Sequence, residues 1–130
     1  MGTVLQVEVS PGELIDKITI LEIKAERIAD PDKLANVHRE LRSLTATREK
    51  ALDTSPELDE FTAELRRINE CLWEIEDDIR DCERNADFGE RFVELARAVY
   101  RTNDRRAAAK RSINELLGSE LVEEKDYADY

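Results

Sequence analysis

Residues 58–82 read LDEFTAELRRINECLWEIEDDIRDC, and their apolar side chains recur at alternating intervals of three and four residues. The stripe consists of Leu58, Phe61, Leu65, Ile68, Leu72, Ile75, Ile79 and Cys82. An apolar period of 3.5 residues keeps one side of a long helix facing a partner helix. The stretch therefore predicts a helix-on-helix protein and indicates no particular chemistry.

A second stripe with the same spacing lies upstream of this stretch. It consists of Leu34, Val37, Leu41, Leu44, Arg48 and Ala51. The turn-forming residues 53–56 (DTSP) separate the two stripes. A short loop between two such helices makes them antiparallel neighbours. The sequence therefore predicts a long antiparallel coiled-coil hairpin over residues 31–85.

The chain ahead of this hairpin predicts a strand and then a helix. Residues 3–9 alternate weakly and are rich in Val, which favours one short N-terminal strand, although a flexible arm is the alternative. A lone strand leaves its backbone groups unpaired, so pairing with a second copy would predict a homodimer. Ser10 and Glu13 form a capping-box pattern for a helix to about Ile28. Ile20 and Ile23 lie opposite the main apolar face of that helix, which is typical of a central helix or of one that contacts a second chain.

Two further helices are predicted downstream of the hairpin. The sequence at 87–90 (DFGE) favours a fourth helix, and Asn103 or Asp104 favours the start of a fifth that ends near Gly118. Residues 119–130 are acidic and are expected to be loose unless Tyr127 or Tyr130 docks. The prediction is an all-α helical bundle, a single domain over 1–130, with five helices and one short strand.

Composition narrows the functional classes. The 130 residues carry a net charge of -11, which disfavours nucleic-acid binding. We see no signal peptide and no apolar run of membrane-spanning length, so we expect no membrane partner and a cytoplasmic location. Cys71 and Cys82 lie eleven residues apart on one helix, about 16 Å of rise, so they cannot form a disulfide with each other.

Charge is unevenly distributed along the chain. Residues 57–83 hold eleven acids and three bases, whereas residues 91–111 hold seven bases and two acids. The favoured interpretation is that these regions neutralise each other. The alternative is an anion site on the fourth and fifth helices, close to free N–H groups at the start of the fifth. Its candidate ligand-binding residues are Arg97, Arg101, Asn103, Arg106 and Lys110.

Patterns for catalysis or metal binding are weak. Glu57 with Glu60 and Glu74 with Asp77 loosely resemble the carboxylate pairs of all-α nucleotide pyrophosphatases, but a chain with 31 acids produces such spacings readily. His38 is the only histidine and has no neighbouring nucleophile. We therefore predict no catalytic residue, no metal ligand and no cofactor.

Three uncommon helix residues suggest tertiary contacts. Asn69 and Asn114 lie inside predicted helices, where asparagine is disfavoured, and each is expected to bond across helices. Trp73 adjoins the apolar stripe and is expected to pack against the first or fourth helix. A partner-binding hot spot is the alternative for Trp73.

Four stretches together resemble a known family. They are residues 12–24 (GELIDKITILEIK), 68–73 (INECLW) with Glu76-Asp77, 94–100 (ELARAVY) with 103–107 (NDRRA), and 110–114 (KRSIN). They are similar to an uncharacterised bacterial family, domain of unknown function 6165, over nearly the whole chain. The resemblance implies no known activity, cofactor or catalytic residue, and relatives near glycosyltransferase modules hint at envelope polysaccharide work.

The polar residues within these stretches include several that were singled out above. They are Asp16, Lys17, Glu76, Asp77, Arg97, Asn103, Asp104, Arg106 and Lys110. This agreement favours one buried polar network that joins the first, third and fourth–fifth helices. For function, we expect a non-enzymatic interaction or adaptor module. The alternative is a binder of, or an enzyme acting on, an anionic phosphate-bearing ligand such as a nucleotide, nucleotide-sugar or sugar phosphate.

Overall fold

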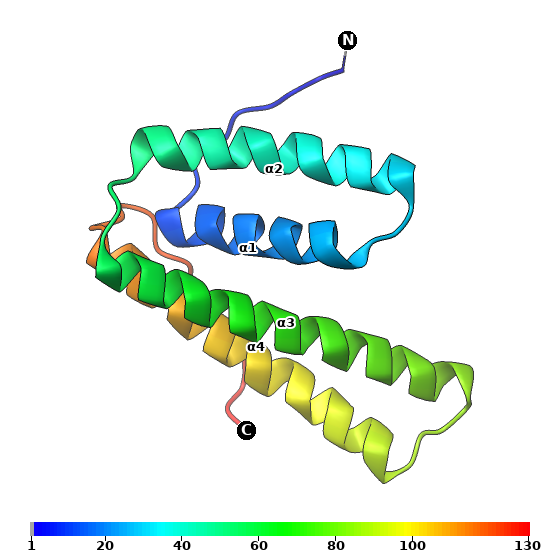
Figure 1. Cartoon of the computed structure of the whole chain (residues 1–130). Coiled ribbons are helices and arrows are strands. Elements are labelled where there is room, and N and C mark those ends of the chain that lie inside the picture. Colours follow the sequence, from blue (N-terminus) through cyan, green and yellow to red (C-terminus); the bar gives the residue numbers. More distant parts are fainter. Residues whose placement is uncertain (1) are drawn as a thin grey trace.

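The computed structural model describes residues 2–130 and contains four α-helices within them. These are α1 (Pro11–Arg27), α2 (Pro31–Ala51), α3 (Pro56–Arg84) and α4 (Glu90–Leu116). Helix α1 packs against each of the other three, and α3 packs along α4. Figure 1 shows the resulting order in space, with α1 between α2 and the α3–α4 hairpin. The predicted all-α class is confirmed.

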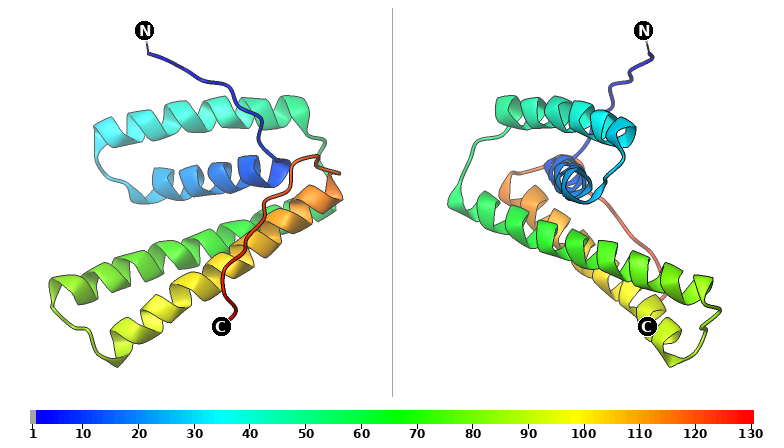
Figure 2. Two further views of the ribbon diagram at one scale, coloured as in Figure 1. Left: turned by 180° about the vertical axis from the view of Figure 1, so that it is seen from behind. Right: turned by 45° about the vertical axis from the view of Figure 1, so that its right-hand side comes forward.

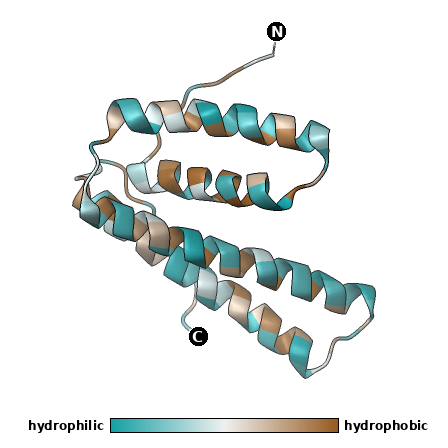
Figure 3. Cartoon of the chain, viewed as in Figure 1, coloured by the Kyte–Doolittle hydropathy of each residue, from teal (hydrophilic) through white to brown (hydrophobic). Residues whose placement is uncertain are grey.

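The core lies where α1, α3 and α4 meet. Its fully packed members are Ile15, Leu58, Leu65, Ile68, Ala109 and Ile113. Half of this set comes from the apolar stripe of α3, which therefore faces α1 and α4 as its period requires. In Figure 3, α1 carries broad hydrophobic bands, whereas the visible side of α3 is largely hydrophilic.

The predicted coiled-coil hairpin over residues 31–85 is not formed. Helix α2 packs against α1 alone, and no backbone contact joins α2 to α3. The reason is the two-sided α1: Leu14 and Leu21 are buried, and so is Ile23 from the other side. Helix α1 lies between the two heptad stripes. The stripe of α2 therefore faces α1, and the stripe of α3 faces α1 and α4, whereas the short loop between α2 and α3 predicted that the two stripes would face each other.

The predicted N-terminal strand is also wrong. Residues 2–10 adopt no regular secondary structure, and all of them except Ser10 are exposed. A strand is stabilised by its ladder of hydrogen bonds, and no neighbouring strand exists among residues 2–130. The segment is therefore an exposed N-terminal arm.

The predicted fourth and fifth helices are one continuous helix. Asn103 and Asp104 lie in the middle of α4, which begins at Glu90. Asparagine and aspartate in a helix interior cost only about 0.7 kcal/mol each, and no Gly or Pro lies between them and the end of the helix at Leu116. Asp87 does not cap this helix: it accepts from the backbone N–H of Gly89, which is the N-cap residue and has no side-chain cap.

Three helices begin with the same local signal, a short polar cap followed by proline. The side-chain oxygens of Ser10, Asp30 and Ser55 accept from backbone N–H groups two or three residues later, at 3.1–3.3 Å. Proline suits the next position because the missing N–H would have no helical partner there. These caps set where α1, α2 and α3 begin. Figure 2 shows that the α1–α2 pair and the α3–α4 hairpin diverge toward the α1–α2 turn.

Candidate functional site

A fully buried carboxylate lies at the junction of three helices. Asp16 of α1 is 0% exposed. Arg106 of α4 approaches it with two parallel hydrogen bonds: Nε donates to Oδ1 at 2.9 Å and Nη2 to Oδ2 at 2.5 Å. This two-pronged geometry is the strongest arrangement available to an Arg–carboxylate pair. Asp16 therefore fixes the position of α4 relative to α1.

Helix α3 joins the same network through Asn69. The Asn69 side-chain amide donates to Asp16 Oδ1 and to Thr19 Oγ1, both at 2.9 Å. Thr19 in turn donates to the backbone carbonyl of Asp16 at 2.8 Å. The expected polar network across three helices is thus present, with Asp16 and Arg106 as members. Of the other expected members, Lys17 is exposed on α1.

A close contact between α1 and α4 lies one turn of α1 away. The backbone N–H of Gly12 donates to Asn114 Oδ1 at 2.7 Å. A Cβ atom at Gly12 would lie only 2.5 Å from the carbonyl oxygen of Lys110. Only glycine allows this approach, so Gly12 and Asn114 set the spacing that the Asp16–Arg106 pair requires. Asn114 bonds across helices, as does Asn69, and both expectations are confirmed.

A cleft of about 430 Å³ opens over the network, where α1 diverges from α3 and α4. This size is in the range of small-ligand pockets. It is lined by Ile20, Ile23, Lys24, Asn69, Leu72, Trp73, Glu76, Asp77, Arg80, Asn103 and Arg106. One side is apolar, and the other presents amides and charges. The buried network therefore forms part of a surface that a ligand can reach.

Several polar groups in this cleft have unused hydrogen-bonding capacity. Arg106 donates from Nε and Nη2 to Asp16, and its Nη1 has no hydrogen-bond partner among residues 2–130. Asn69 donates twice, and its Oδ1 has no partner within the same residues. Lys24 and Asp77 form no ion pair within the described chain. The hydrogen bond with Asp16 raises the pKa of Arg106 despite partial burial, so this side chain stays cationic.

The five predicted ligand-binding residues do not form one patch. Asn103, Arg106 and Lys110 follow one face of α4 at intervals of three and four, and the first two line the cleft. Arg97 and Arg101 lie toward the opposite side of the same helix. Arg97 pairs with Glu94 at 3.1 Å. The helix start expected near Asn103 does not exist, so it supplies no free N–H groups to an anion.

Lys110 is already satisfied by the chain's own carboxylates. Its ammonium, in a side chain only 9% exposed, lies 2.7 Å from Glu13 and 2.9 Å from Glu123. Burial lowers the pKa of Lys110, but its hydrogen bonds with Glu13 and Glu123 outweigh burial and raise it overall. Lys110 therefore joins α1, α4 and the C-terminal tail.

Sequence reasoning missed part of the cleft. Lys24 and Arg80 were not singled out, and Thr19 was not recognised as a network member. Trp73 packs beside α1, as expected, with the Arg27 guanidinium 6.0 Å from its ring centre. The available signal was spacing, because Asp16, Thr19 and Ile23 recur at three- and four-residue intervals on α1.

The acidic side chains of α3 do not form a metal site. Glu76 lies 3.3 Å from Arg80, and both line the cleft with Asp77. Glu57 and Glu60 lie near the other end of α3, where both are exposed. Within residues 2–130, no three His, Cys, Asp or Glu side chains come together to hold a metal ion.

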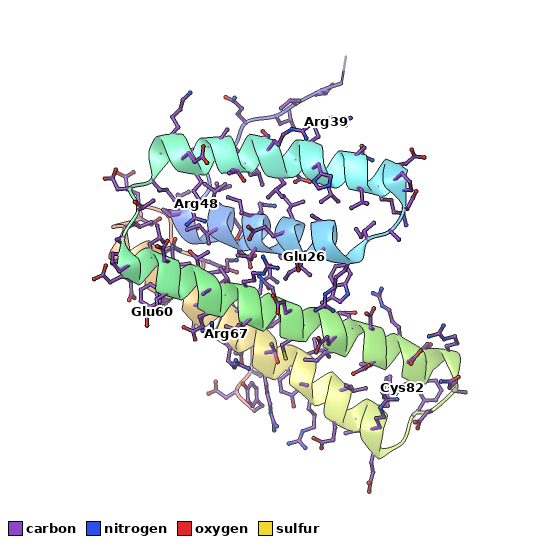
Figure 4. The ribbon with its side chains drawn as sticks, viewed as in Figure 1. Glu26, Arg39, Arg48, Glu60, Arg67 and Cys82 are labelled. Carbon is purple, nitrogen blue, oxygen red and sulfur yellow. The ribbon has the colours of Figure 1, made fainter. Side chains whose placement is uncertain are left out.

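Peripheral charges instead stabilise the helix arrangement. Arg66 of α3 reaches Glu26 at 2.5 Å and Glu70 at 2.9 Å. Figure 4 labels Glu26 on α1 and also Cys82 near the α3–α4 turn. Cys71 and Cys82 are both free, as their spacing on one helix required. Arg66 thus pairs α1 with α3. Of the predicted neutralisation between residues 57–83 and 91–111, the described chain contains one ion pair, Arg91 with Asp78 at 3.8 Å.

Comparison with known proteins places the chain in a family. The model of a family of unknown function, DUF6165, matches residues 5–129. The chain belongs to this family. A search of curated proteins and a search of solved structures each found no significant match. No helix among residues 2–130 of this DUF6165 member combines the length and apolar character needed to cross a membrane.

Proposed function

We propose that this DUF6165 protein is a non-enzymatic binding module whose recognition site is the cleft between α1, α3 and α4. The proposal rests on one observation: Asn69 and Arg106 are held in place by the buried network around Asp16, yet each keeps a hydrogen-bonding atom that binds nothing else among residues 2–130. Asn69 is held by two donated hydrogen bonds, and its Oδ1, which accepts none among residues 2–130, is open to solvent in the cleft, since no buried side-chain polar atom of these residues lacks a partner. Arg106 is held twice by Asp16 and keeps Nη1 available. Groups positioned in this way bind a ligand without further ordering cost.

The α1 and α4 side of the cleft suits a compact anion with an apolar or flat part, whereas Glu76 and Asp77 make the α3 side acidic. Arg106 and Lys24 supply positive charge, and the Asn103 amide adds donors. Ile20 and Trp73 supply the apolar wall opposite them. A phosphate-bearing molecule such as a nucleotide, nucleotide-sugar or sugar phosphate meets these requirements. The polar centre would bind the charge, and the wall would cover the remainder.

The test is a thermal-shift screen of the full chain against these three ligand classes, followed by calorimetry. A ligand that binds only the folded state raises the melting temperature. Lys24→Met and Asn103→Ala remove cleft groups without leaving Asp16 unpaired, and each should weaken binding by about tenfold. Arg101→Met is the matched control, because Arg101 lies on the other side of α4. A flat screen, or equal loss in the control, would refute the cleft as an anion site.

Pairing with a second copy of the chain has separate support in the N-terminal arm. Val4, Leu5 and Val7 are 85%, 81% and 76% exposed. Apolar side chains of this kind on a segment with unpaired backbone groups favour pairing with another chain. A second copy of the same arm is the simplest partner, so the protein would be a homodimer in solution.

Light scattering on the full chain and on a variant lacking residues 1–9 tests this pairing. The full chain should have the mass of a dimer, and the shortened variant that of a monomer. Val4→Ser with Val7→Ser is a milder change and should shift the balance in the same direction. A full-length monomer, or a dimer that survives loss of the arm, would contradict the pairing.

A further inference from the structure

The acidic C-terminal tail, residues 119–130, folds back along α4. Gly118 adopts a φ of +64°, and Ser119 donates its N–H to the backbone carbonyl of Asn114 at 2.8 Å. This left-handed turn, which glycine adopts without steric cost, reverses the chain at the end of α4. The tail that follows has no regular secondary structure.

Charge attracts the tail to α4 at two successive glutamates. Glu123 lies 2.9 Å from the Lys110 ammonium, and Glu124 lies 3.5 Å from Arg111. Arg111 also donates to the backbone carbonyl of Glu123 at 3.3 Å. The contact with a backbone oxygen is independent of sequence, whereas the two carboxylate contacts require acidic side chains.

The tail ends in an aromatic contact nearer the middle of α4. The Tyr130 hydroxyl donates to Asp104 at 2.6 Å, and its ring lies 4.9 Å from that of Tyr100. Every residue from Glu120 to Tyr130 remains exposed. Hollows of about 550 and 650 Å³ separate tail segments from α4. Apart from the part-buried Lys110–Glu123 pair, the tail is attached by exposed contacts, which contribute little stability each, and it buries no core side chain.

We infer that the face of α4 formed by Ala107, Ala108, Lys110 and Arg111 is a docking surface for an extended acidic segment of a partner protein. The chain's own tail occupies it when no partner is bound. Two alanines leave room for a backbone to approach the helix, and two adjacent cations match two successive carboxylates. The seated tail shows that an extended segment with this pattern fits. This surface is separate from the cleft, and the inference does not rest on the proposed function.

The experiment measures competition on the full chain. The probe is a labelled peptide with the tail sequence GSELVEEKDYADY (residues 118–130), followed by fluorescence anisotropy. Glu123→Gln with Glu124→Gln should release the tail and open the surface. Because a tethered segment competes at a millimolar effective concentration, the released variant should bind the probe at least about tenfold more tightly than the native chain. Binding should weaken with added salt.

Matched variants separate docking from general charge. Asp126→Asn with Asp129→Asn removes the same charge from two residues that make no ion pair with the rest of the described chain, so probe binding should stay at the native level. Arg111→Gln in the released variant should abolish probe binding. Replacing the probe's residues Glu123 and Glu124 with glutamine should abolish it as well. Equal binding to the native and released chains, or equal gain in the control variant, would overturn the inference. A dimer that the Glu123/Glu124 change dissolves would also overturn it, since the occupant would then be a second copy's tail.

Discussion

Asp16 illustrates how one residue organises three helices. A fully buried carboxylate costs several kcal/mol unless it is paired and hydrogen-bonded. Here Arg106 and Asn69 supply three donated bonds, from α4 and α3 respectively. The same donors line the cleft, so the groups that position the helices also shape the candidate site. Stability and binding are therefore linked at this residue.

Replacing Asp16 with Asn tests this arrangement. The change keeps the side-chain shape but leaves the half-buried Arg106 cation unpaired, so the free energy of unfolding should fall by about 3–5 kcal/mol. Urea denaturation measures the loss. Glu94→Gln removes the exposed partner of Arg97 and should cost less than about 1 kcal/mol. A loss below about 1 kcal/mol for Asp16→Asn would show that the pair is not a structural centre.

Residue types indicated the network members but not their pairing. Asn69 and Arg106 lie 53 and 90 positions from Asp16 along the sequence. Their polar character at helix positions showed that each needs a partner. Which partner each one has depends on how α1 crosses α3 and α4, and no local pattern encodes that crossing.

At the scale of elements, three helices start where a side-chain cap coincides with a following proline. Ser10, Asp30 and Ser55 each have this combination, and α1, α2 and α3 begin directly after them. Asn103 and Asp104 are cap-type residues without a following proline. There, unbroken helical hydrogen bonding and packing along α3 outweigh the local preference for a cap.

Two alanine substitutions distinguish a real cap from an apparent one. Ser55→Ala removes the acceptor of the Leu58 N–H and should destabilise the protein by about 1 kcal/mol. Asn103→Ala replaces a mid-helix residue with a better helix former and should leave stability unchanged or raise it by about 0.5 kcal/mol. Thermal unfolding of each variant without ligand shows whether its melting temperature falls or rises. A clear loss for Asn103→Ala would indicate that a helix starts there.

At the scale of the whole molecule, the uneven charge is resolved by contacts between distant segments. Two acids of α3 pair with cations of other helices, Glu74 with Arg27 of α1 and Asp78 with Arg91 of α4, and the acidic tail pairs with the basic part of α4. The carboxylate of Glu123 faces Lys110 and is also attracted by the positive charges of Lys125 and Arg106. The hydrogen bond from Lys110 lowers the pKa of Glu123 below its usual 4.5 despite some burial.

The pH dependence of tail attachment follows from these two shifts. Because the pKa of Glu123 is lower in the folded chain, its contribution is present above pH 4.5 and is lost as pH falls below that value. The raised pKa of Lys110 preserves the pair up to pH 10.5, above which it is lost. Amide hydrogen exchange of the Ser119 N–H, corrected for intrinsic exchange rates, should show protection that declines on acidification before the helices unfold by circular dichroism.

Glu123→Gln is the control for this dependence. In that variant the protection of Ser119 should already be reduced at pH 7 and should no longer show the decline. An acid response identical to that of the native chain would mean that another group controls the tail.

By itself, the sequence determined the helical class, the starts of three helices and the residues that need buried partners. Apolar periodicity and helix caps depend on residues close together in the sequence, so they can be recognised in each segment separately. Only the tertiary structure decided that α1 separates the two heptad stripes, that α3 pairs with α4, and that Asp16, Asn69 and Arg106 meet beside a cleft. Those outcomes depend on which helix packs its apolar face against which other helix. Several pairings satisfy the same stripes, and the choice among them is made by contacts such as Gly12 against Lys110 that join residues far apart in the chain.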